Sequence, residues 1–174
     1  MFALGLLAGG IAQVALVVAD LEAAVEHYWH QFGVGPWSFY TYQRPLLRGM
    51  SYHGEPADYA MRLALANADA LRIELIQVLH GQTVYADHIA AHGYGVHHLG
   101  VLVPDMQMAL AQARQAGYAV LQEGYGFGLD GDGHFAYIDT EAELGVMLEL
   151  IERPARRVEP DKVYPAPETP RTSP

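Results

Sequence analysis

Apolar residues recur along the chain with two different spacings, which predict where strands and helices lie. Residues 11–18 form an apolar run rich in β-branched side chains, typical of a buried strand. Asp20 then occupies a position suited to an N-cap, and apolar residues repeat at helical spacing as far as the Gly/Pro-rich residues 33–36. The chain is therefore expected to begin with a strand followed by a helix.

Three more strands are predicted before residue 80. Residues 37–42 are aromatic and strand-like, and a loop rich in Pro and Gly follows them. Residues 59–66 and 71–78 flank a short polar turn, which indicates a hairpin. Residues 10–79 thus have the predicted order β-α-β-β-β.

The same order is predicted again after a linker at 80–95 that contains a short helix over 84–91. Asp105 is the expected N-cap of a second long helix. The predicted elements of this second module are a strand at 96–103, a helix at 106–115, and strands at 118–123, 134–139 and 144–151.

The two halves also resemble each other in sequence. Residues 11–25 are echoed by residues 96–110, and residues 71–77 by residues 146–152. We therefore predict an α+β fold in which two tandem βαβββ modules form an open, barrel-like mixed sheet. The predicted domain spans 1–153, with module 1 at 10–79, the linker at 80–95 and module 2 at 96–153.

Under this self-alignment each module contributes two polar residues to otherwise apolar strands. Gln13 aligns with His98, and Glu74 aligns with Glu149. A buried carboxylate is unfavourable unless it is paired, protonated or bound to a metal, and a single one is usually satisfied by a neighbouring Arg or hydroxyl. Because the four positions recur in pairs, we interpret them as a metal site.

Composition narrows the choice of partners and ligands. The net charge is −10, and residues 1–152 contain five arginines, no lysine and 17 acids, so nucleic-acid binding is not expected. Without cysteine, any metal must be held by N and O ligands. The uncharged residues 1–19 are interrupted by Gly9-Gly10 and partly repeated inside the chain, so we interpret them as a leader and a buried strand rather than a membrane span.

Residues 154–174 differ in composition from the rest. They contain six of the ten prolines, interleaved with charges, and are predicted to form an extended tail, disordered or lying along the surface. A cytoplasmic location is the expectation for the whole chain.

The phrases IAQVALVVADLEAAVEHYWHQFGVGPW and GVHHLGVLVPDM, with the paired strands IELIQ and LELIE, resemble the vicinal oxygen chelate superfamily. This superfamily includes glyoxalase I, methylmalonyl-CoA epimerase, extradiol dioxygenases and fosfomycin and bleomycin resistance proteins. The similarity covers roughly residues 10–153 and is closest to the glyoxalase-like, epimerase-like branch. It implies that a divalent cation (Zn, Co, Ni, Mn or Fe) lies in the cleft of an open barrel. Its implied ligands are Gln13, Glu74, His98 and Glu149.

The resemblance also implies a chemistry. We expect a metal-dependent isomerase, epimerase or lyase that acts on a small carbonyl compound through a metal-stabilised enolate. Glu149 is the expected catalytic base and Glu74 its partner across the cleft. One alternative is a non-catalytic binding or resistance protein that sequesters a hydrophobic compound. A ring-cleaving dioxygenase is disfavoured, because Gln13 stands where that group has a histidine.

The expected substrate is small and apolar or aromatic rather than a CoA ester, because aromatic residues are dense around the predicted cleft and the body has few cations. Arg72 is either a carboxylate clamp or a salt-bridge partner. A homodimer is expected from the exposed edges of such a sheet. The candidate substrate-binding residues are Trp37, Phe39, Tyr40, Arg72, His134 and Tyr137.

Overall fold

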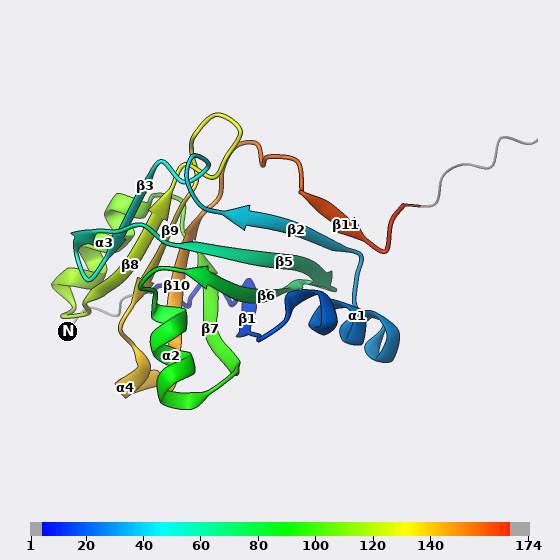
Figure 1. Cartoon of the computed structure of the whole chain (residues 1–174). Coiled ribbons are helices and arrows are strands. Elements are labelled where there is room, and N and C mark those ends of the chain that lie inside the picture. Colours follow the sequence, from blue (N-terminus) through cyan, green and yellow to red (C-terminus); the bar gives the residue numbers. More distant parts are fainter. Residues whose placement is uncertain (1–4, 168–174) are drawn as a thin grey trace, which may run out of the picture.

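The two predicted modules form the two halves of one curled mixed sheet, described over residues 5–167 in a computed structural model (Figure 1). The sheet has 11 strands in the order β11-β2-β5-β6-β1-β7-β10-β9-β8-β3-β4. The first strands of the two modules, β1 (Gln13–Val17) and β7 (Gly95–Leu102), pair antiparallel at its centre. On either side lie β6 (Leu71–His80) and β10 (Met147–Glu152), each parallel to the first strand of its own module. The predicted open, curled α+β sheet is confirmed.

The helix-capping residues and the hairpin turn predicted for the first module are found in the structure. The Asp20 side chain accepts a hydrogen bond from the Ala23 backbone N–H at 3.0 Å, and Gly33 ends the helix with a left-handed φ of 67°. The hairpin forms around the predicted turn. The elements of this half other than β1 and β6 are α1 (Leu21–Phe32), β2 (Trp37–Tyr42) and β5 (Ala60–Ala68).

The second module follows the same plan, and Asp105 caps its long helix by accepting from the Met108 N–H at 2.9 Å. A short helix that the sequence did not predict, α4, precedes β10. No helix within residues 5–167 has the length and apolar character needed to cross a membrane. The remaining elements are α2 (Val84–His92), α3 (Met106–Gln115), β8 (Val120–Tyr125), β9 (His134–Ile138) and α4 (Glu141–Leu144).

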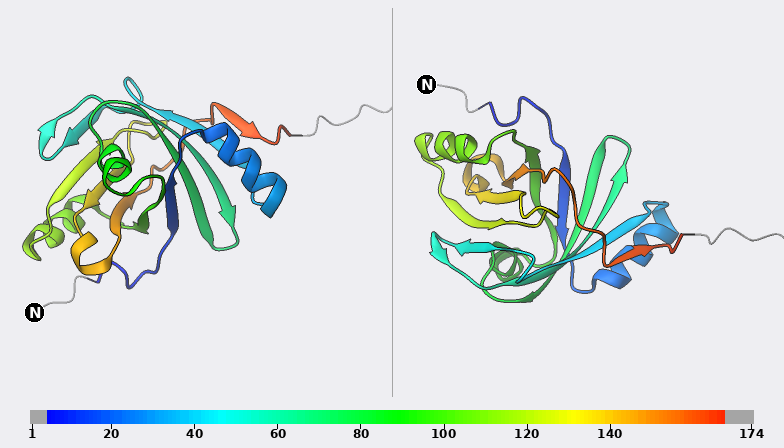
Figure 2. Two further views of the ribbon diagram at one scale, coloured as in Figure 1. Left: turned by 60° about the horizontal axis from the view of Figure 1, so that its bottom comes forward. Right: turned by 90° about the horizontal axis from the view of Figure 1, so that it is seen from above.

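Three short strands lie where a loop or a tail was predicted. The loop after β2 contains β3 (Gly49–Tyr52) and β4 (Glu55–Pro56), and β3 pairs with β8 of the other half. In the tail, β11 (Lys162–Tyr164) pairs antiparallel with β2. Figure 2 shows the segment after β10 leading to this strand. Residues 168–174 of the predicted tail lie outside the described residues.

Side chains alternate between the two faces of each strand, so the sheet has hydrophobic core residues on both its outer face and its inner face. Helix α1 covers the outer face of the first half, and α3 covers that of the second. The inner, concave face collects aromatic side chains from both halves, including Tyr40, Tyr42, Phe135 and Tyr137. Polar residues on the inner face of the four central strands must therefore meet in the middle of the protein.

Candidate metal centre

Four polar side chains meet on the concave face, one from each of the four central strands. Gln13 comes from β1, Glu74 from β6, His98 from β7 and Glu149 from β10. Their exposed fractions are 3, 7, 0 and 5% respectively. The duplicated sequence thus brings together the four residues that it singled out.

The contacts among these four residues converge on the two carboxylate groups. Gln13 Nε2 donates to Glu74 Oε2 at 2.8 Å and to Glu149 Oε2 at 3.0 Å. His98 Nε2 lies 3.4 Å from Glu74 Oε2 and 3.1 Å from Glu149 Oε2. Gly100, beside Gln13 and Glu149 in the sheet, leaves the space for this approach, because an added Cβ would lie 2.9 Å from Gln13 Cβ.

Two buried carboxylates so close together need a compensating positive charge. Burial raises the pKa of Glu74, His98 opposes this rise, and the Glu149 charge adds to it. Burial disfavours the charged form of His98, but Glu149 and Glu74 outweigh it and raise the His98 pKa to about 9. The metal-free site therefore places a proton on His98 at neutral pH.

His97 fixes the orientation of His98. The Nδ1 atoms of the two rings are 2.8 Å apart, and His97 Nε2 lies 3.3 Å from the Val84 carbonyl oxygen. Burial, together with the His98 charge, lowers the His97 pKa to about 2, so that the His97 ring is neutral. His97 then donates to Val84 and accepts at Nδ1 from His98, which directs His98 Nε2 towards the carboxylates.

Regular alternation along β7 would direct His97 to the face opposite His98, and a bulge interrupts that alternation. The pairing between β1 and β7 shifts at this point, from Ala15 opposite His98 to Leu16 opposite Val96, so His97 has no partner on β1. An extra residue of this kind re-aims side chains locally. His97 is consequently buried beside His98.

Two tyrosine hydroxyl groups, hydrogen-bonded in series, support the Glu149 carboxylate at its Oε1 atom. Tyr137 Oη donates to Glu149 Oε1 at 2.8 Å, and the hydroxyl groups of Tyr137 and Tyr85 are 2.7 Å apart. Burial, with the nearby Glu149 charge, raises the pKa of both tyrosines, so they remain protonated donors. Glu149 is thereby held through one oxygen, and its other oxygen faces the centre.

Tyr137→Phe is expected to lower the affinity of the centre for a cation by about tenfold to a hundredfold, because a hydrogen bond to a charged group contributes about 1.5–3 kcal/mol. Titration of the metal-stripped protein with Mn²⁺ would measure the change. Tyr85→Phe, which removes only the more distant hydroxyl, is the matched control and should have a smaller effect. Equal affinities for Tyr137→Phe and the unmodified protein would contradict this supporting role.

The donor set fits a divalent cation. Among the described residues, Glu74, His98 and Glu149 offer ligand atoms that all lie within 4.8 Å of one another. His98 Nε2 is buried and, although close to both carboxylates, forms no well-aligned hydrogen bond within residues 5–167. A half-turn of the Gln13 amide exchanges Nε2 for an oxygen ligand. One imidazole, one amide and two carboxylates suit Zn²⁺, Co²⁺, Ni²⁺, Mn²⁺ or Fe²⁺.

A polar pocket of about 300 Å³ lies between β2, β5 and the start of β6, and none of the four residues of the centre lines it. Arg72, opposite Gln13 in the sheet and two residues before Glu74, lines it together with Tyr40 and Asn67. Arg157, from the segment after β10, reaches the same pocket and lies over the Tyr40 ring at 5.3 Å. Sequence reasoning missed Arg157, because its segment was assigned to the tail.

The other predicted substrate residues lie in different surroundings. Trp37 and Phe39 are buried in the cluster beneath α1, on the convex face, so their placement gives no support for contact with a substrate. His134 begins β9 and places Nε2 3.0 Å from Glu123 Oε2. Of the six residues, Tyr40 and Arg72 line the pocket and Tyr137 contacts the centre.

Comparison with solved structures finds proteins of similar fold. A Streptomyces coelicolor methylmalonyl-CoA epimerase variant in complex with 2-nitronate-propionyl-CoA has a TM-score of 0.60 at 22% identity, over 85% of this chain and 96% of that one. The methylmalonyl-CoA epimerase of Mycobacterium tuberculosis has a TM-score of 0.56 at 25% identity, over 89% and 93%. A hypothetical protein from Bacillus halodurans has a TM-score of 0.57 at 16% identity, over 86% and 98%.

The family itself is shown by sequence. No curated protein matches the chain. Residues 12–137, more than half of it, match the family described as "Glyoxalase/Bleomycin resistance protein/Dioxygenase superfamily". The chain therefore belongs to the glyoxalase/bleomycin resistance/dioxygenase superfamily.

Proposed function

We propose that this protein is a divalent-metal-dependent isomerase or epimerase that moves a proton at a carbon next to a carbonyl group. The observation that carries the proposal is the convergence of Glu74, His98 and Glu149 in one buried space, with His98 Nε2 facing both carboxylates. A lyase that begins with the same proton removal belongs to the same chemical class. Relatives of similar fold that are named as methylmalonyl-CoA epimerases support this class.

In this proposal the carboxylates perform the proton transfers. Glu149 takes the proton from carbon through the oxygen that Tyr137 leaves available, and Glu74 lies on the other side of the centre to return one. Without a cation, Gln13 and His98 contact the two carboxylates at 2.8 to 3.4 Å, and with a cation they would be its ligands beside them. When bound, a divalent cation supplies the Lewis acidity that polarises the carbonyl group and stabilises the negative charge left by proton removal.

We further propose that the substrate carries an anionic group. Arg72 and Arg157 reach one pocket, and neither forms an ion pair with a carboxylate within residues 5–167. Burial, and then the charges of Arg157 and Arg153, lower the pKa of Arg72, although a guanidinium stays protonated. Two neighbouring cations beside an aromatic wall form a suitable site for a carboxylate or phosphate.

Hydrogen exchange tests the proposal without knowledge of the product. Metal-loaded protein in D₂O would be mixed with methylmalonyl-CoA, and separately with a short thioester of methylmalonate that lacks the nucleotide. Loss of the α-proton signal in the NMR spectrum is expected for at least one of them. Exchange of the short thioester alone would support a small substrate. Binding of both without any exchange would contradict the isomerase and favour a binding protein.

Arg72→Gln is expected to raise the KM for an anionic substrate by about tenfold to a hundredfold, because a charged hydrogen bond contributes about 1.5–3 kcal/mol. It should leave the KM for a neutral ester of the same compound nearly unchanged. The same exchange assay measures both values. Arg114→Gln, which changes a half-exposed arginine on α3, is the matched control. An equal effect on the charged and neutral compounds would exclude an anion-binding role for Arg72.

A further inference from the structure

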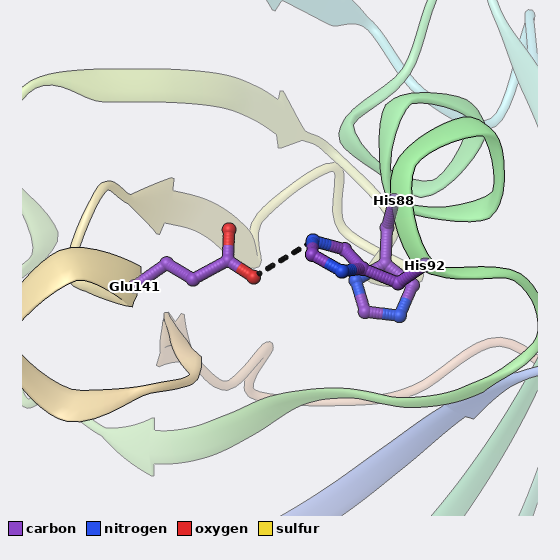
Figure 3. Close-up of side chains that lie close together, drawn as sticks. All are labelled: His88, His92 and Glu141. Carbon is purple, nitrogen blue, oxygen red and sulfur yellow. Dashed lines mark ion pairs between the residues drawn. The ribbon is translucent and has the colours of Figure 1, made fainter.

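Two histidines and a glutamate form a second cluster outside the buried centre, at the surface where α2 meets α4. His88 and His92 are four residues apart on α2 and therefore lie on the same face, one turn from each other. Their ring centroids are 4.9 Å apart. Figure 3 shows Glu141, from α4, pointing towards this pair, with Glu141 Oε1 3.2 Å from His92 Nε2.

We propose that His88, His92 and Glu141 form a second divalent-cation site, separate from the buried centre. Each residue offers one ligand atom, and these atoms lie within 4.8 Å of one another. Metal bonds of about 2.0–2.2 Å require the three atoms to approach by about an ångström. The side chains of His92 and Glu141 are 52% and 45% exposed, so rotation about their torsions can supply that movement.

The ligand chemistry distinguishes this site from the buried one. Two imidazoles and one carboxylate, with the remaining positions open to water, favour Zn²⁺, Ni²⁺ or Cu²⁺. The buried centre offers oxygen from two carboxylates and an amide, and so also accepts Mn²⁺. Ni²⁺ should therefore occupy both sites, whereas Mn²⁺ should occupy the buried centre alone.

A cation at the surface site would join α2, the helix of the linker, to α4 of the second module. The first residues of α2 contact two residues that support the buried centre, because the Val84 carbonyl oxygen accepts from His97 and the Tyr85 hydroxyl bonds to Tyr137. The His88 ring lies edge-on to His97 with centroids 5.0 Å apart. On the other side, α4 immediately precedes β10, which carries Glu149. The proposed site thus connects the two segments that flank the centre.

The test counts bound nickel ions. The full chain, stripped with EDTA and reloaded with NiCl₂, would be passed through a desalting column, and nickel per chain would be measured by mass spectrometry. The His88→Ala/His92→Ala double variant should bind one equivalent less than the unmodified chain. The His27→Ala/His80→Ala double variant, which removes two exposed histidines elsewhere, should bind the same number as the unmodified chain.

This difference of one equivalent does not depend on the buried centre, which contributes equally to all three proteins. If the buried centre held no nickel, the counts would be one, none and one. Equal nickel binding by His88→Ala/His92→Ala and the unmodified chain would overturn the surface site. Mn²⁺ binding should be the same in all three proteins, and loss of Mn²⁺ from the first double variant would also overturn the separation of the two sites.

Discussion

Glu149→Gln is expected to lower turnover by about 10²–10⁴-fold, because an amide cannot accept the substrate proton and a positioned base contributes about that much. It also removes one of the two negative charges that attract a cation to the centre. The exchange of carbon-bound hydrogen in D₂O, measured with saturating Mn²⁺, gives the change in rate. The expected effect is larger than those of Tyr137→Phe and Arg72→Gln.

The fold should survive this substitution. Glutamine has nearly the same shape, and its oxygen can still accept the hydrogen bond from Tyr137. Circular dichroism should therefore stay close to that of the unmodified protein. Glu26→Gln, at an exposed position on α1, is the matched control and should retain full turnover.

Glu74→Gln provides a comparison between the two carboxylates. If Glu74 and Glu149 share the proton transfers, as proposed, both substitutions should reduce exchange by a similar order. A Glu149→Gln protein that keeps full exchange, with cation bound, would remove Glu149 from the role of base. In that case Glu74 would be the remaining carboxylate at the centre.

The sequence duplication made the central strands of the fold predictable. Apolar runs at residues 11–18 and 96–103 became β1 and β7, and the self-alignment brought Gln13, Glu74, His98 and Glu149 onto the four central strands. Such elements are predictable because their hydrophobic period is strong and repeated. The convergence of four polar residues then follows from alternation along paired strands.

Features that depend on distant partners were not predictable in this way. Strand β3 is a short stretch in a Pro/Gly-rich loop, and it exists as a strand because β8 of the other module offers a free edge. Strand β11 forms on the free edge of β2 within a proline-rich segment. In both cases the stabilising hydrogen bonds come from residues far along the chain, which local sequence does not encode.

Within the site, the sequence left open which face of β2 is the inner one. Adjacent residues Phe39 and Tyr40 are both buried, but Phe39 packs beneath α1 and Tyr40 lines the pocket. Aromatic residues on both faces give no signal for the choice. The bulge that turns His97 towards His98 is also invisible in the sequence, because it depends on the register between β1 and β7.

The metal-free protein is expected to lose stability as pH rises from 6.5 to about 9, the interval between the unfolded and folded pKa values of His98. The folded chain binds the His98 proton more tightly than the unfolded chain does. The resulting stabilisation is complete below pH 6.5 and is lost as pH rises through the folded pKa. A shift of this size corresponds to about 3 kcal/mol in the free energy of unfolding.

The contribution of His97 to stability has the opposite sign. Its pKa falls to about 2 on folding, so the unfolded chain binds a proton that the folded chain cannot accept. Below pH 6.5 His97 therefore lowers the stability of the metal-free protein, while Glu74, whose pKa is raised on folding, acts in the opposite direction. A divalent cation replaces the proton at His98 Nε2, so its affinity should rise with pH over the interval in which the metal-free protein weakens. Urea denaturation in EDTA and with saturating Mn²⁺, at pH values from 5 to 9, measures both trends.

A metal-free midpoint that stays constant between pH 6.5 and 9 would mean that His98 carries no proton at the centre. The two carboxylates would then need another source of positive charge.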